Sequence, residues 1–266
     1  MIGMCTVDEV SAVLCSLAPH RLAEDWDNVG LLVGDPDRVV ARIMTCLTVT
    51  PESVREAIEQ QVDLIVTHHP IPFRPLHRLT TEEMTGRLLL SLIGDGISVY
   101  SPHTAFDSAK DGINQQLAEA LGLLEIAPLQ AAVDDPDGLG AGRWGRLGDS
   151  QTVAQVGDRL KEFLGIEGLQ VVGQLTRPVH RVAVACGSAG QFLLAARNHG
   201  CELLVTGETS FHTCLAAAAD EIAVLLPGHY ASERFAVESL AGTLSSRFPD
   251  LVVWASRGET DPLQWI

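Results

Sequence analysis

The chain has 266 residues, of which 46% are apolar, and its mean hydropathy is slightly positive at +0.18. A chain of this length and composition buries a substantial core, which excludes wholesale disorder. Its net charge of −16 argues against a general nucleic-acid binder, because an acidic surface repels phosphate backbones.

The cysteines and the N-terminal segment predict a cytoplasmic protein. The six cysteines include no Cys-x-x-Cys pair, so we expect reduced thiols and no disulfide framework. No apolar stretch of the sequence approaches the length that crosses a membrane. Asp8 and Glu9 stand where a signal peptide would need a basic flank and an apolar core. We therefore expect a cytosolic protein with no membrane partner.

Short β-branched runs alternate with longer amphipathic runs along the first half of the chain, a pattern typical of α/β proteins. Residues 43–49 are predicted to form a strand, and residues 51–61 a helix with Thr50 as its N-cap. Further strands are predicted at residues 63–67 and 97–100.

The second half of the chain repeats this pattern. Aligned without a gap, residues 41–70 and 180–209 place Asp-Leu-Ile-Val-Thr of the first half opposite Glu-Leu-Leu-Val-Thr of the second. The elements expected in the second copy are a strand at 181–185, a helix at 190–198, and strands at 202–206 and 222–226. Such an internal repeat predicts two related α/β domains.

Histidines and carboxylates follow several of these predicted strands. The three motifs are His68-His69, His103-x3-Asp107 and His229-x3-Glu233. Sites in open α/β sheets gather at the carboxyl ends of the strands, so the three motifs could converge in space. Imidazole nitrogens combined with carboxylate oxygens suit zinc, manganese, iron or nickel. The repeat therefore predicts two related half-sites with enough ligands for two metal ions.

Each motif alone has an ordinary explanation. A His-His pair before proline is as readily a turn as a pair of ligands, and a histidine four residues before a carboxylate is commonly an ion pair on a helix surface. The comparable positions of all three motifs within a repeated frame favour the metal site.

Two residues near these motifs are candidates for proton transfer. Glu208 lies opposite His69 in the aligned repeat, and Glu208 or His212 could act as a general base or acid beside a substrate. The alternative for both is a capped helix start after a strand, which we favour for His212.

Five motifs spaced along nearly the whole chain carry a family resemblance. They are Asp-Asn-Val-Gly-Leu at 27–31, Thr-His-His-Pro at 67–70, His-Thr-Ala-Phe-Asp at 103–107, Thr-Gly-Glu at 206–208 and Gly-His-Tyr-Ala-Ser-Glu at 228–233. In this combination they resemble the YbgI-like family, the GTP cyclohydrolase I type 2 homologues. Ala105 and Phe106 depart from the Asn and Leu that relatives commonly carry, which weakens any transfer of substrate specificity.

The resemblance implies a subunit of two α/β domains with a dinuclear metal centre between them, and a homohexameric ring whose sites face an inner cavity. We expect a first domain at residues 1–128 and a second at residues 129–266, whose C-terminal part returns to the shared site. The resemblance also implies two divalent ions per subunit, held by His68, His69, Asp107, His229 and Glu233.

Two of the site residues have roles that the resemblance refines. Glu233 is the best candidate to bridge both ions, because a carboxylate has two oxygens to share. By the repeat, His103 is the counterpart of His229. The family likeness instead favours His103 as a neighbour that orients Asp107 or a metal-bound water.

Two other segments allow either a structural or a binding role. The resemblance makes Asp27 and Asn28 candidates for the cavity, but we favour a hydrogen-bonded turn. Residues 134–148 are rich in Gly and Asp and are expected to form the loop or hinge that leads into the second half. Arg143 and Arg146 in this segment could hold a phosphate or carboxylate, although ordinary surface arginines are the favoured interpretation.

Two functions remain open. The first is a metal-dependent hydrolase of a nucleotide-like or phosphorylated small molecule, in which Glu208 or His103 moves a proton. The family name implies opening of the imidazole ring of GTP, yet the sequence has no phosphate-binding loop of the Walker type. The second is a non-catalytic metal-binding scaffold or regulatory ring protein. Five protein ligands for two ions leave positions for water or substrate, which favours the hydrolase.

Overall fold

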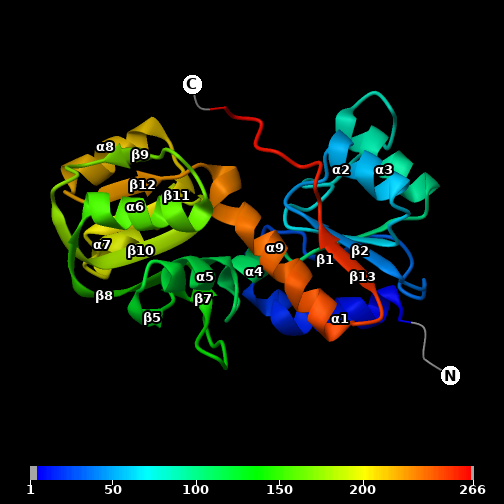
Figure 1. The fold of residues 1–266 in the computed structure, drawn as a ribbon, viewed down its shortest axis with the longest axis horizontal. Helices are drawn as coiled ribbons and strands as arrows, with labels where there is room; N and C mark the ends of the chain where they lie inside the picture. The colour runs from blue at the N-terminus through cyan, green and yellow to red at the C-terminus, as the bar shows by residue number, and fades with distance from the viewer. Residues whose placement is uncertain (1–4, 265–266) are drawn as a thin grey trace. The chain divides into compact units, whose positions relative to one another are not determined.

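The computed structural model describes residues 5–264 and shows a mixed α/β protein with two compact units (Figure 1). The first unit comprises residues up to 106 together with residues 236–262. The second unit comprises residues 107–235 together with residues 263 and 264. Each unit has its own sheet with helices packed on it, so the predicted α/β class is confirmed.

A five-stranded sheet forms the centre of the first unit, in the order β1-β4-β3-β2-β13. The strands are β1 (Gly30–Val33), β2 (Arg42–Cys46), β3 (Leu64–Thr67), β4 (Ser98–Ser101) and β13 (Val252–Ala255). All neighbours are parallel except β1, which runs antiparallel to β4. The carboxyl ends of β3 and β4 consequently lie at the same edge of this sheet.

The helix between β2 and β3, α2 (Pro51–Glu59), begins where the sequence predicts. The Thr50 hydroxyl accepts a hydrogen bond from the Ser53 amide, and the Ser53 hydroxyl accepts one from the Thr50 amide. Pro51 occupies the first helical position, where the backbone amide has no acceptor within the helix, so the lack of an amide proton costs no hydrogen bond. The next helix, α3 (Met84–Gly94), covers the same face of the sheet as α2 (Figure 1).

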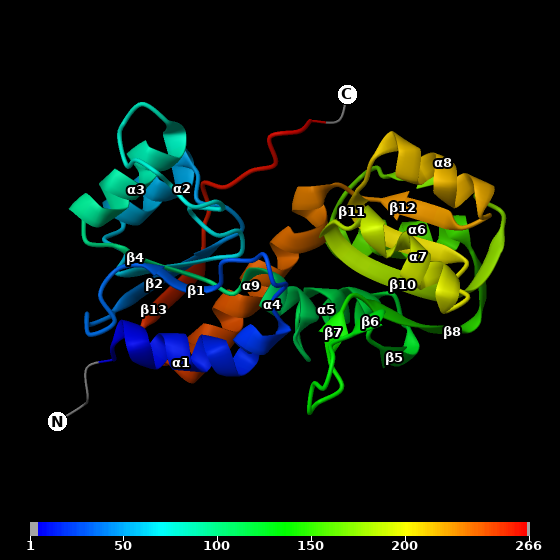
Figure 2. The same ribbon diagram turned by 180° about the vertical axis from the view of Figure 1, so that it is seen from behind.

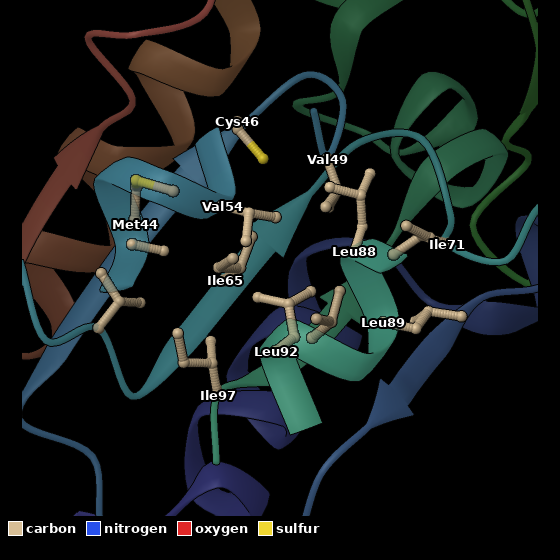
Figure 3. Close-up of a cluster of buried hydrophobic side chains, with 13 residues drawn as sticks. Met44, Cys46, Val49, Val54, Ile65, Ile71, Leu88, Leu89, Leu92 and Ile97 are labelled. Carbon is tan, nitrogen blue, oxygen red and sulfur yellow. The ribbon is translucent and has the colours of Figure 1, made fainter. Parts of the chain in front are cut away.

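The core of the first unit fills the space between this sheet face and the two helices (Figure 3). Met44 and Ile65 from adjacent strands and Leu92 from α3 are completely buried. Burying each side chain of this kind contributes about 1.5–3 kcal/mol to stability. The strands that end in histidines therefore rest on a well-packed apolar layer.

Two helices pack on the opposite face of this sheet, as the view from behind also shows (Figure 2). α1 (Val7–Leu17) is capped by Thr6, whose hydroxyl accepts a hydrogen bond from the Glu9 amide. α9 (His229–Arg247) begins in the second unit, and its residues from 236 onward belong to the first. The buried Thr45 hydroxyl donates a hydrogen bond of 2.7 Å to the Val237 carbonyl and ties this part of α9 to β2.

A six-stranded sheet forms the centre of the second unit, in the order β5-β8-β10-β11-β12-β9. Three central strands, β10, β11 and β12, are parallel, and β8 and β9 run antiparallel to their neighbours. The strands are β5 (Leu124–Ala127), β8 (Arg143–Thr152), β9 (Gln170–Val172), β10 (Pro178–Ser188), β11 (Leu203–Glu208) and β12 (Ala223–Leu226). A small separate ribbon pairs β6 (Gln130–Ala131) with β7 (Gly140–Ala141).

Helices cover both faces of the second sheet (Figures 1 and 2). On one face, Ala196 of α7 (Leu193–Asn198) and Ala217 of α8 (Phe211–Ala219) pack into an apolar cluster with the sheet. On the other face lies α6 (Val153–Leu164), capped by a Thr152–Gln155 capping box. The remaining helices are α4 (His103–Ser108) and α5 (Ile113–Ala120), together with 3-10 turns at His20–Leu22 and Gly190–Phe192.

The elements of the predicted repeat are present in both halves of the chain. The first copy runs β2-α2-β3-α3-β4 and the second runs β10-α7-β11-α8-β12, and in each the three strands are parallel and in sequential order. The repeated βαβ pattern is therefore real at the level of strands and helices. Common origin of the two copies stays a prediction.

One segment differs from its prediction. The expected loop at 134–148 contains a strand, because β8 begins at Arg143. Arg143 is only 2% exposed, so it is not a surface arginine. Its guanidinium donates to the Gln115 side chain and to four carbonyl oxygens, those of Ser108, Ala109, Gly140 and Gly142. Arg143 thus joins three parts of the second unit, whereas Arg146 pairs with Glu125 on the surface.

Candidate metal centre

Three histidines of the first unit lie at the carboxyl ends of β3 and β4. His68 and His69 follow β3 directly, and His103 is the first residue of α4. Each ring offers a nitrogen, and these nitrogens lie within 4.8 Å of one another. His68 and His103 are buried, and His69 is partly buried. The first unit therefore brings together three imidazole donors of the kind that zinc, iron, nickel and manganese accept.

Neighbouring groups hold the δ nitrogens of two of these rings. His103 Nδ1 lies 2.7 Å from Asp27 Oδ1, and His69 Nδ1 lies 2.7 Å from the Thr48 hydroxyl. Such contacts fix the ring orientation and the tautomer of a histidine. They make Nε2 the nitrogen with which each ring would approach a metal ion.

The buried Asp27 carboxylate is a partner of His103, in addition to the turn that the sequence favours for it. The Asn28 amide donates a hydrogen bond to Asp27 Oδ1 in the expected turn. The same carboxylate also accepts hydrogen bonds from the Thr104 amide and hydroxyl. Burial alone would raise the pKa of Asp27, yet hydrogen bonds from His103 and Thr104 lower it to about 2. Asp27 is thus a carboxylate at neutral pH.

The backbone of His103 is itself unusual. Its φ of 28° lies in the left-handed region that residues other than glycine rarely adopt. Strain of this kind persists only where surrounding contacts hold it, and it often accompanies functional sites. Here the Asp27 carboxylate supplies such a contact on both His103 and the next residue, Thr104.

The second unit places a histidine and two carboxylates around the first turn of α9. His229 Nδ1 lies 3.0 Å from Glu208 Oε1 at the end of β11, and His229 Nε2 lies 3.2 Å from Glu233 Oε2. The hydrogen bond to Glu233 raises the pKa of His229 to about 9, with burial opposing and Glu208 adding to the rise. A metal ion at His229 would therefore have to displace a proton.

Two glycines, Gly187 and Gly207, leave space for this turn of α9. A Cβ at Gly187 would collide with the Glu233 carboxylate, and a Cβ at Gly207 would lie 2.5 Å from the Ser232 hydroxyl oxygen. Gly187 also has a φ of 65°, which favours glycine. The glycines thus allow the carboxyl ends of β10 and β11 to approach His229 and Glu233 closely.

Asp107 lies one turn after His103 in α4, and a cysteine is its partner. The buried Cys186 thiol lies 3.2 Å from Asp107 Oδ1. Burial raises the pKa of Cys186 well above its usual range, and the nearby charges of Asp107 and Glu233 raise it further. Cys186 therefore stays protonated and donates to the Asp107 carboxylate. Nothing in the spacing of the cysteines indicated this role.

The predicted site residues all lie at a strand end or in the first turns of a following helix. They are His68, His69, His103, Asp107, Glu208, His229 and Glu233. His212 lies instead at the start of α8, where the Ser210 hydroxyl accepts a hydrogen bond from the Thr213 amide. This is the capped helix start that the sequence favours for His212.

The same histidine–carboxylate pair occurs once in each unit. In both, a strand leads into a helix whose first residue is a histidine, and that histidine's Nδ1 contacts a carboxylate: Asp27 on His103 and Glu208 on His229. Histidines that bind metals are commonly oriented in this way by a carboxylate on the other ring nitrogen. The two carboxylates come from different places, because Asp27 lies before β1 and Glu208 lies at the end of β11.

The sheets, their strand-end histidines and the paired carboxylates define an α/β protein with the donor groups of a metal-binding site. The chain belongs to the DUF34/NIF3 family (NGG1p interacting factor 3), whose model matches residues 5–262. A Clostridium acetobutylicum protein named GTP cyclohydrolase 1 type 2 homolog is 34% identical over 97% of this chain and 98% of its own length. NIF3-like protein 1 of Drosophila melanogaster is 31% identical over 93% of this chain and 85% of its own.

Solved structures show the same fold. A Bacillus cereus protein related to NIF3 has a TM-score of 0.89 at 22% identity, covering 99% of this chain and all of that one. The protein YbgI has a TM-score of 0.83 at 22% identity, covering 97% of this chain and all of that one. The resemblance expected from the sequence motifs is confirmed. No helix of residues 5–264 is both long enough and apolar enough to span a membrane.

Proposed function

We propose that the protein is a dinuclear metal-dependent hydrolase that acts on a nucleotide-like or phosphorylated small molecule. The observation that carries this proposal is the histidine–carboxylate pair that each unit builds at the end of a strand. In our proposal the metal ligands are His68, His69, Asp107, His229 and Glu233.

The donor set fits the proposed ions. Imidazole nitrogens and carboxylate oxygens suit zinc, iron, manganese or nickel. When bound, two such ions would lower the pKa of a water molecule and polarise an oxygen of the substrate. Five protein ligands would leave positions for both.

The protein's own groups have distinct tasks in this proposal. Glu233 is buried and would offer two carboxylate oxygens to the ions. The Glu208 side chain is 52% exposed while it contacts His229, so it can reach solvent and substrate and is the group to which we assign proton transfer. His103 is the second candidate for that task, because Asp27 fixes its ring beside His68 and His69.

Relatives support the reaction class by name alone. Several of them are called GTP cyclohydrolase 1 type 2 homologs, a name that suggests a purine nucleotide as substrate. The buried Arg143 is committed to carbonyl oxygens, so it does not serve as a phosphate ligand for such a substrate. We also propose the homohexameric ring that the resemblance implies, which mass measurement of the native protein would test.

The proposal is tested by turnover. Metal-reconstituted protein is incubated with a panel of nucleotides and phosphoesters, beside Glu233→Ala and the matched variant Glu238→Ala, which alters an exposed residue of the same helix. We expect metal-dependent turnover in the wild type and in Glu238→Ala, and its loss in Glu233→Ala. Metal-loaded wild type that turns over no compound would contradict the hydrolase and favour a metal-binding scaffold.

A further inference from the structure

Two aromatic side chains of the first unit are exposed beside the histidines. Trp26 is 62% exposed and Phe73 is 52% exposed. Their ring centroids lie 5.9 Å apart with an interplanar angle of 48°. Large aromatic side chains that are exposed side by side are characteristic of surfaces that bind a ligand or another protein.

Both rings contact His103 through an edge. The Trp26 and Phe73 centroids lie 5.9 and 6.0 Å from the His103 centroid, at interplanar angles of 76° and 75°. The His103 ring in turn lies 5.1 Å from the ring of His68 and 5.6 Å from that of His69. The aromatic pair therefore adjoins the histidine cluster within a single unit.

The loops that carry the pair are held in place. Trp26 directly precedes Asp27, whose buried carboxylate is bonded to His103 and Thr104. Phe73 follows Pro72, whose carbonyl accepts a hydrogen bond of 3.4 Å from the Asn28 side chain. The two rings are thus presented by segments that are linked to each other and to the histidines.

Packing on His103 does not account for the exposure of these rings. The other tryptophans among residues 5–264 have partners: Trp144 stacks on His199, and Trp254 packs under Arg42 and donates to Glu56. The rings that contact Trp26 within the described part of the chain are tilted or edge-on, and 62% of its surface is exposed. A face of this kind is suited to stacking against a flat ring.

We infer that Trp26 and Phe73 form an aromatic subsite that binds a planar heteroaromatic ring of the substrate beside the histidine cluster. The inference rests on the proposed function and narrows it, since it predicts a ring-bearing substrate in place of a purely aliphatic phosphoester. Stacking on such side chains tolerates different rings because every base has a π face, so the subsite selects for a ring without naming it.

The test compares two probes that differ in the ring alone. Binding of a purine nucleoside monophosphate and of ribose 5-phosphate to metal-loaded protein is measured by calorimetry, with metal content determined on the same samples. The variants are Trp26→Leu and Phe73→Leu. The control is Phe211→Leu, which removes an aromatic ring that is 72% exposed in α8 of the second unit.

We expect the purine nucleotide to bind the wild type more tightly than ribose 5-phosphate, and its Kd to rise about tenfold or more in Trp26→Leu and in Phe73→Leu. The Kd for ribose 5-phosphate, the metal content and the Phe211→Leu control should not change. Equal affinity of the wild type for both probes, absence of purine binding, or an unchanged purine Kd in both variants would overturn the subsite. If the subsite is overturned but the protein still turns over a compound without a ring in a metal-dependent reaction, the proposed hydrolase function is retained.

Discussion

Contacts at the Nδ1 atoms of His103 and His229 fix the orientation of the two imidazole rings. Each contacts a carboxylate, Asp27 at 2.7 Å and Glu208 at 3.0 Å. The sequence predicts the histidines, because their residue type and their place after strands are local features. It does not predict Asp27 or Cys186 as partners, because these residues lie 76 and 79 positions away from the groups that they contact.

We expect Asp27→Asn to weaken metal binding about 10- to 100-fold, the usual effect of losing a carboxylate that orients a ligand or its neighbour. Asparagine keeps an acceptor for His103 Nδ1 but removes the negative charge. Competitive metal titration of the purified protein measures the effect. Asp25→Asn, an exposed change two residues away, serves as the control, and equal affinities in the two variants would argue against the role of Asp27.

We expect Gly187→Ala to disrupt the position of Glu233 and to lower metal content. A Cβ at this position would collide with the Glu233 carboxylate. Gly165→Ala is a matched control, because Gly165 has a φ of 66°, close to the 65° of Gly187, and has open space around it. In both variants, a side chain at positive φ lowers the free energy of unfolding by about 1 kcal/mol. A loss of bound metal that is equal in the two would refute the steric explanation.

At the level of elements, the parallel strands and capped helices are the features that local sequence predicts well. Thr50 and Pro51 mark the start of α2, and the apolar runs mark the central strands. The position of β13 beside β2 is not local information, because residues more than 200 positions apart form this pair. Trp254 of β13, and Ser256 and Gly258 after it, also donate hydrogen bonds to one carboxylate on α2, that of Glu56.

We expect Glu56→Gln to lower the free energy of unfolding by about 1–2 kcal/mol at neutral pH. The effect is smaller than for a fully buried charged acceptor, because solvent screens the partly exposed Glu56 carboxylate. Its carboxylate accepts hydrogen bonds from the Trp254 indole, the Ser256 hydroxyl and the Gly258 amide. Although burial raises the pKa of Glu56, these hydrogen bonds lower it below its usual value.

The sign of the pH dependence follows from that lowered pKa. The stabilisation is complete above the usual pKa of a glutamate and is lost as the pH falls through the lower pKa of the folded state. Denaturant unfolding at several pH values should therefore show a gap between wild type and Glu56→Gln that closes in acid. Glu59→Gln, an exposed change in the same helix, should show no gap; a gap that persists in acid would contradict the assignment.

At the scale of the whole molecule, the sequence predicts the α/β class, the repeated βαβ pattern and the family. It does not predict that residues 236–262 belong to the first unit, because one continuous helix, α9, leaves the second unit and enters the first. It also places a loop where Arg143 opens the long strand β8, since the Gly and Asp content of that segment is typical of turns. The buried contacts of Arg143 come from distant segments and leave no local signal.

Our central proposal is that two divalent ions are held by His68 and His69 of the first unit and by Asp107, His229 and Glu233 of the second. Metal analysis of reconstituted protein, by mass spectrometry of the digested sample against protein concentration, tests this claim most directly. We predict two ions per chain in the wild type and loss of bound metal in the double variant His68→Ala/His229→Ala, which removes one proposed ligand from each unit. Two ions per chain retained in that double variant would contradict the account.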